Sequence, residues 1–387
     1  MKTQIARTGL RIKVLDSALV SLGFLVFRVN DWWLLRIGGV KGDGNFSDLS
    51  LTYKLAQCEE GPCAGYIYGE PLAWFLRLIK PSESAVNLFG NLCTLLFLLF
   101  AYKYLSRMKS LREKLLLLAV LFGPPTQLLL ERMNLDLILF FMTLIALKHL
   151  MHPIFSYSLL AFGSLIKAYM VLPMFLFIIF KHKSISRFKL YILLFLTLGI
   201  GVYATIDYFS KSGPYETWNQ SFGVLVIGTW LETITGLSRT QSVAISVALI
   251  VSICLLQMKT KLSETMTWES LSSGYLSLIK KYRDLLILPM GAMIWIFFIN
   301  FDYRMIFLTL PMAFISLKLK NNVMYLIVIT VTWLSSTNLF PGIKYAYPVS
   351  QLIGDLFGVI LCFAAAKLSF ELIKLSIRVP SLSRMGK

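Results

Sequence analysis

The chain has 387 residues, of which 57% are apolar and 15% are charged, and its mean hydropathy is +0.70. Because soluble domains carry about 25% charged residues, this composition excludes an ordinary soluble enzyme, a disordered chain and a coiled coil. The 38 basic residues exceed the 20 acidic ones, giving a net charge of +18. Nucleic acid binding is one interpretation of this charge. The basic residues lie in clusters between apolar segments, however, which indicates membrane topology instead and no nucleic acid partner.

The predicted elements follow the apolar segments, several of which approach the ~20 residues that cross a bilayer as a helix. The first segment follows a basic N-terminus and has no small-residue cleavage site after it, which predicts an uncleaved span. In chain order, the apolar segments occupy about residues 14–30, 84–102, 115–130, 135–150, 154–180, 190–208, 241–258, 285–300, 303–317, 322–337 and 350–370.

The basic clusters lie at both termini and between alternate apolar segments, which places both termini in the cytoplasm. The stretch 154–180 has basic residues at both ends, so it should form two short helices in a hairpin, with Lys167 at the turn near the outer face. We predict an all-α, polytopic transmembrane protein of about 10–12 membrane segments in the plasma (inner) membrane. Residues 1–387 would form a single integral-membrane domain.

Two outside loops are long, at about residues 31–82 and 209–240. The first is rich in aromatic residues and ends in a segment that predicts an interfacial helix started by Pro71. Tyr68 and Trp74 would be its anchors at headgroup depth.

Ionisable groups at membrane depth are costly and usually functional. A Pro-Pro pair at 124–125 breaks one helix, and four polar residues follow at the start of the next: Glu131, Arg132, Asn134 and Asp136. The macrodipole favours carboxylates there, and an anion could also bind. The alternative is an ordinary helix start with an i,i+4 ion pair between Arg132 and Asp136.

Further charged residues fall on the same predicted outer side. Asp43 and Asp48 follow the first apolar segment and could be solvated loop carboxylates. Lys167 either snorkels to the interface or faces a polar cavity, where a cation suits a phosphate. Asp302 and Arg304 either pair with each other or leave Arg304 as a second phosphate ligand. Together, these groups favour chemistry on an anionic, membrane-anchored substrate.

The sequence requires no metal or other cofactor. Its cysteines and histidines are too few and too scattered for a zinc or iron–sulfur site. The spacing of Cys58 and Cys63 leaves open whether they form a disulfide. Asp48, Glu131 and Asp136 could share a divalent cation, but nothing in the sequence demands one.

Several segments in order resemble the GT-C superfamily of integral-membrane glycosyltransferases, and in particular the branch of polyprenol-phosphate-mannose-dependent mannosyltransferases (family 87). The Tyr68 segment departs from the plain Tyr-Pro of that branch by having Gly-Glu before Pro71. The resemblance covers about residues 40–310 and rests on Asp48-Leu-Ser, Tyr68-Gly-Glu-Pro-Leu, Leu130-Glu-Arg-Met-Asn-Leu-Asp136, Ser164-Leu-Ile-Lys-Ala-Tyr169 and Asn300-Phe-Asp-Tyr-Arg304.

The resemblance implies inverting transfer of a hexose, such as mannose, from a polyprenyl-phosphate donor on the extracytoplasmic face. The acceptor would be a hydroxyl of a lipid or glycan of the cell envelope. Asp48 would be the general base, with Asp43 as the alternative. Because the leaving group is a phosphate, it needs cations, for which Lys167, Arg304 and Arg132 are the candidates. The substrate-binding candidates are Glu131, Asn134, Asp136, Tyr169, Asp302, Tyr68 and Trp74.

Two other classes of function remain as alternatives. Broken helices with charges at depth also suit a lipid-linked glycan flippase or transporter. The predicted membrane charges lie near one face, however, which favours an outer-face site over a path through the bilayer. A non-catalytic membrane assembly subunit would carry the same carboxylates in structural pairs.

Overall fold

The structure is a computed structural model that describes residues 13–25, 47–56, 69–132, 135–150, 152–181, 185–211, 221–222, 227–259, 268–297, 300–334 and 346–378. Over these residues the chain is helical, as predicted, except for one antiparallel pairing of two-residue strands, β1 (Ser221–Phe222) with β2 (Asn300–Phe301). The candidate site residues Asp43, Tyr68 and Asn134, and the cysteines Cys58 and Cys63, lie outside the described residues.

The helices follow the predicted apolar segments closely. After a first helix at 13–25 come α2 (Ser47–Ala56), α3 (Glu70–Ile79), α4 (Glu83–Leu105), α5 (Leu111–Leu121), α6 (Pro124–Arg132), α7 (Asp136–Lys148), α8 (Pro153–Ile166), η2 (Ala168–Met170), α9 (Val171–Lys181), α10 (Arg187–Lys211), α11 (Ile227–Thr235), α12 (Arg239–Lys259), α13 (Trp268–Lys281), η4 (Arg283–Ile287), α14 (Leu288–Phe297), η5 (Asp302–Met305), α15 (Ile306–Lys318), α16 (Asn322–Leu334) and α17 (Ala346–Arg378).

Three helical stretches in the described part of the chain are long and apolar enough to cross a membrane: Glu83–Leu105, Arg187–Ala204 and Val349–Lys374. Five more apolar helices are shorter, among them the pair on either side of Lys167. The predicted 10–12 segments and the placement of both termini therefore stay predictions. They would require the shorter helices to cross in pairs or to be surrounded by protein.

The elements differ from the apolar segments at a proline break and at three helices that were not predicted, α2, α11 and α13. The segment 115–130 is two helices, because Pro124 starts α6 after the turn at Phe122. α3 begins at Glu70 with Pro71 in its first turn, as predicted. The stretch 259–283, interpreted as a basic loop, contains α13, which buries Leu271, Tyr275 and Ile279 at a spacing of four residues.

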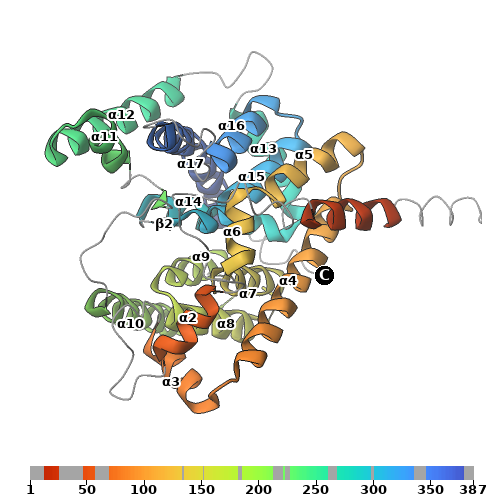
Figure 1. Ribbon diagram of the computed structural model, residues 1–387, viewed down its shortest axis with the longest axis vertical. Helices are drawn as coiled ribbons and strands as arrows, with labels where there is room; N and C mark the ends of the chain where they lie inside the picture. Colours follow the sequence, from red (N-terminus) through yellow and green to blue (C-terminus); the bar gives the residue numbers. More distant parts are fainter. Residues whose placement is uncertain are drawn as a thin grey trace, which may run out of the picture.

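The core of the bundle is α15, whose residues Ile306 to Leu317 are all buried. A helix that is apolar on every side belongs in the interior, and α15 packs on α5, α14, α16 and η5. In Figure 1, α11 to α17 form one part of the molecule, and α7 to α10 lie beside it with α2 and α3.

Two largely buried helices, α7 and α15, each have an ionisable residue at or just before the N-terminal end and a lysine at the C-terminal end. α7 begins at Asp136 and ends at Lys148, and α15 begins after Arg304 and ends at Lys318. Each has 13 residues, so each spans about 20 Å at a rise of about 1.5 Å per residue. The lysine ends therefore lie about 20 Å from the ends that carry Asp136 and Arg304.

Candidate functional site: a buried charge cluster

The carboxylate of Asp136 is the centre of a buried polar cluster. Lys167 Nζ lies 3.0 Å from each of its two oxygens. Arg304 Nε donates to Oδ2 at 3.0 Å, and the Tyr169 hydroxyl donates to Oδ1. All four side chains are buried. We refer to Asp136, Lys167, Tyr169 and Arg304 as the Asp136 cluster.

Breaks in the helices place these side chains together. Asp136 is the first residue of α7, where the macrodipole stabilises its charge. Lys167 follows the last residue of α8 with an extended backbone (φ −142°, ψ 127°), and Tyr169 lies in the 3-10 turn η2 that leads into α9. Arg304 lies in a second 3-10 turn, η5, before α15. Irregular backbone therefore surrounds the carboxylate, although short apolar helices flank it.

An aromatic wall lines one side of the cluster. The Arg304 guanidinium carbon lies 5.1 Å from the centre of the Tyr169 ring. That ring packs edge-on against Phe307 at 6.3 Å, and Phe307 packs edge-on against Phe140 at 5.2 Å. Apolar walls exclude water and strengthen the interactions of charges inside them. The aromatic side chains beside the Asp136 cluster therefore strengthen the electrostatic interactions within it.

Gly69, in the first predicted outside loop, contacts the backbone beside Lys167, where the helix is interrupted between α8 and η2. The Gly69 N–H donates to the carbonyl of Ile166 at 2.9 Å. A Cβ atom on Gly69 would lie only 1.7 Å from the carbonyl oxygen of Leu165, so no other residue fits without movement. Gly69 was noted in the sequence only as a departure from a family pattern. The sequence signal for this contact is a glycine directly before Glu70-Pro71. A residue without a side chain at that place lets the start of a helix approach another backbone closely.

The predicted site residues separate into three groups. Asp136, Tyr169, Lys167 and Arg304 come together in one cluster. Trp74 lies on the exposed face of α3, with 62% of its surface accessible, which suits an interfacial anchor and not a contact to the cluster. The backbone is described, but the side chain is not, for Asp48 in the first turn of α2, Glu131 and Arg132 in the last turn of α6, and Asp302 in η5.

One structural alternative from the sequence is wrong. Lys167 does not snorkel to an interface, because its ammonium group is buried against Asp136. Arg304 pairs with Asp136, which lies far away in sequence, and this contact was not anticipated from the neighbouring Asp302. A second buried ion pair lies outside the Asp136 cluster.

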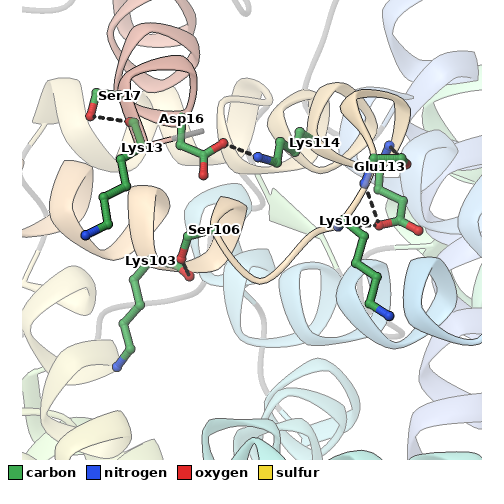
Figure 2. A network of polar contacts seen from close by, with 9 residues as sticks. Lys13, Asp16, Ser17, Lys103, Ser106, Lys109, Glu113 and Lys114 are labelled. Carbon is green, nitrogen blue, oxygen red and sulfur yellow. Dashed lines mark hydrogen bonds and ion pairs between the residues drawn. The ribbon is translucent and has the colours of Figure 1, made fainter. Parts of the chain in front are cut away.

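That second pair joins Asp16 of the first helix to Lys114 of α5, and both side chains are buried (Figure 2). The start of α5 is fixed beside it by a capping box, in which Ser110 and Glu113 each accept a backbone N–H of the other. The local sequence does not predict this pair, because the two residues lie 98 positions apart in the chain.

Within the described ranges, no three side chains of His, Cys, Asp or Glu come close enough together to hold a metal ion. Asp136 contacts two cations instead. No family model matches the chain, and neither the curated proteins nor the solved structures contain a match.

Proposed function

We propose that the chain is a multi-pass membrane glycosyltransferase of GT-C type. It would move a hexose, such as mannose, from a polyprenyl-phosphate donor to a hydroxyl of a lipid- or glycan-linked acceptor, on the extracytoplasmic face of the plasma membrane. The observation that supports this most is the convergence of Lys167 and Arg304 on Asp136 at a break between helices.

This arrangement suits a phosphate leaving group. When the bond from the anomeric carbon to the phosphate oxygen breaks, negative charge grows on the phosphate, and fixed cations in an apolar site stabilise it. A guanidinium carries five N–H donors and an ammonium three, so each can serve Asp136 and a second acceptor. Asp136 would hold both cations in place before the donor arrives.

The depth of the cluster favours a substrate carried by a lipid. α7 and α15 span about 20 Å, whereas the hydrocarbon core of a bilayer is about 30 Å thick. With the lysine ends of these helices at one interface, the Asp136 cluster would lie about 10 Å inside the opposite one. A polyprenyl chain would reach that depth from within the bilayer.

The general base is a different carboxylate in this proposal. Asp136 already accepts from three donors, which stabilises its ionised form and occupies the lone pairs that an acceptor hydroxyl would need. Asp48, with Asp43 as the alternative, comes from the first outside loop. α2, which begins at Ser47, packs against α6 and α3. It is thus anchored to the two elements that border the cluster.

The experiment is transfer of radiolabelled sugars from polyprenyl phosphate by purified protein in nanodiscs, with a membrane extract as the acceptor. Wild type would be run beside Asp48→Asn, with Lys54→Gln on the same helix as a matched surface control. We expect transfer with wild type and Lys54→Gln and none with Asp48→Asn. Activity in Asp48→Asn would overturn the assignment of the base. Translocation of label without transfer, across a panel of donor sugars, would indicate a flippase.

A further inference from the structure

Cations from several elements gather at the end of the bundle that lies about 20 Å from the Asp136 cluster, along α7 and α15. Lys103, at the end of α4, interacts electrostatically with Arg107, with Lys148 at the end of α7, and with the carboxylate of Asp284. Lys318, at the end of α15, interacts electrostatically with the carboxylate of Glu113 and with three cations, Lys109, Lys281 and Arg107. We refer to Lys103, Arg107 and Lys148 as the basic end cluster.

Arg107 is the fixed centre of this cluster. Its guanidinium carbon lies 4.5 Å from the ring centre of Tyr104 and 5.0 Å from that of Tyr282. One nitrogen pairs with Asp284 at 2.5 Å, and Lys318 Nζ donates to the Arg107 carbonyl. Stacking and pairing hold the arginine rigidly, so its position does not depend on a ligand.

The positive charges around Arg107 exceed the negative ones within the described part of the chain. Asp284 is engaged by Arg107, and Glu113 is engaged in capping α5 (Figure 2). Lys103 and Lys148 are both exposed, and neither forms an ion pair with another described side chain. The cations of the basic end cluster repel one another electrostatically, and an anion placed between them would relieve that repulsion.

The surface next to the cluster indicates where the anion comes from. Leu92, Leu95, Leu96 and Leu99 are each at least half exposed on α4. Their spacing of three and four residues continues to Lys103, so they form one apolar stripe that ends on the cation. α4 is also one of the stretches long and apolar enough to cross a membrane. An acyl chain along this stripe would place its phosphate at Lys103.

We propose that the basic end cluster binds the phosphate headgroup of an anionic phospholipid, whose acyl chain lies along the leucine stripe of α4. This inference shares with the proposed function the location in a membrane, but it does not depend on glycosyl transfer. It assigns to the cluster a lipid bound at a defined place, at the far end of the bundle from the donor site.

The test is native mass spectrometry of the purified full chain released from detergent in the presence of phosphatidylglycerol or phosphatidylcholine. The test variant is Lys103→Gln/Lys148→Gln, which changes only exposed side chains. Its matched control, Lys54→Gln/Lys80→Gln, removes the same charge from exposed positions on α2 and after α3. Each basic group near an anionic surface contributes enough that losing two should weaken phosphatidylglycerol binding roughly 30-fold.

We expect wild type and the control to retain phosphatidylglycerol in preference to phosphatidylcholine, and the test variant to lose that preference. Equal retention of phosphatidylglycerol by the test variant and wild type would overturn the proposal. Loss of phosphatidylglycerol on adding inorganic phosphate at matched ionic strength would also overturn it, since it would assign the cluster to free anions. Polyprenyl-phosphate sugar transfer, measured on the same preparations, reports separately on the proposed function.

Discussion

Arg304 Nε lies 3.0 Å from Oδ2 of Asp136, although 168 residues separate them in the chain. Both residues stand at the start of a buried helix, so this contact aligns the ends of α7 and α15. Lys167, at the break between α8 and α9, contacts the same carboxylate. One carboxylate thus fixes three helix junctions at the same depth.

Replacing Asp136 with Asn should destabilise the protein strongly. The substitution leaves Lys167 and Arg304 buried without the carboxylate that they share, and breaking a buried ion pair in this way costs about 3–5 kcal/mol. Unfolding of the purified protein, followed by intrinsic fluorescence in detergent, measures the loss. A double-mutant cycle with Lys167→Gln should give a coupling free energy of at least about 0.5 kcal/mol. Additive effects would contradict a direct interaction.

Replacing Tyr169 with Phe should have a smaller effect. The ring that packs against Arg304 and Phe307 stays, and only the hydroxyl that donates to Asp136 is lost. A hydrogen bond to a charged group contributes about 1.5–3 kcal/mol. The same unfolding measurement should therefore rank Tyr169→Phe between wild type and Asp136→Asn. A loss as large as that of Asp136→Asn would mean that the hydroxyl, and not the charge, organises the cluster.

A methyl group at Gly69 should reduce activity more than stability. It would clash with the carbonyl of Leu165 and push α3 away from the break at Lys167, displacing the loop that carries the proposed base. Gly199→Ala, in α10, is the control, because a Cβ atom there meets nothing within 4 Å. Alanine inside a helix is favoured over glycine by about 1 kcal/mol. Transfer rates per folded protein should fall for Gly69→Ala alone, and equal rates would show that the docking is not needed.

The pair of Asp16 and Lys114 should matter for stability and not for transfer. Both side chains are buried, so Lys114→Met should leave Asp16 without its partner and destabilise the protein by about 3–5 kcal/mol. The pair attaches the first helix to α5 (Figure 2), away from the Asp136 cluster. Transfer by the folded fraction should be unchanged, and a selective loss of transfer with normal stability would contradict a structural role.

The sequence predicted the helices better than their contacts. Long apolar segments and basic ends define helices such as α4 and α10 locally, and Pro124 marked the break before α6. α13 was missed because its buried face is narrow and its exposed face is polar. Asp136, Lys167 and Arg304 were each selected as candidates from the cost of charges in apolar surroundings, and Tyr169 from the family resemblance.

What the sequence could not predict is which charges meet. Lys167 and Arg304 were each assigned to a phosphate, and Asp136 was assigned to substrate, but their shared contact depends on how distant segments fold together. Arg132 and Asp302 were the nearer partners in sequence. The buried pair of Asp16 and Lys114 was missed for the same reason.

The central claim is that Lys167 and Arg304 hold the phosphate of a lipid-linked donor, and direct binding tests it most closely. Binding of polyprenyl phosphate to the full chain in nanodiscs would be measured for wild type, Lys167→Gln, Arg304→Gln and the control Lys114→Gln, each corrected for its folded fraction. A charge-assisted hydrogen bond is worth about 1.5–3 kcal/mol, so each site variant should bind about 10- to 100-fold more weakly, while Lys114→Gln binds like wild type. Unchanged binding in both site variants, or an equal loss in the control, would contradict the account.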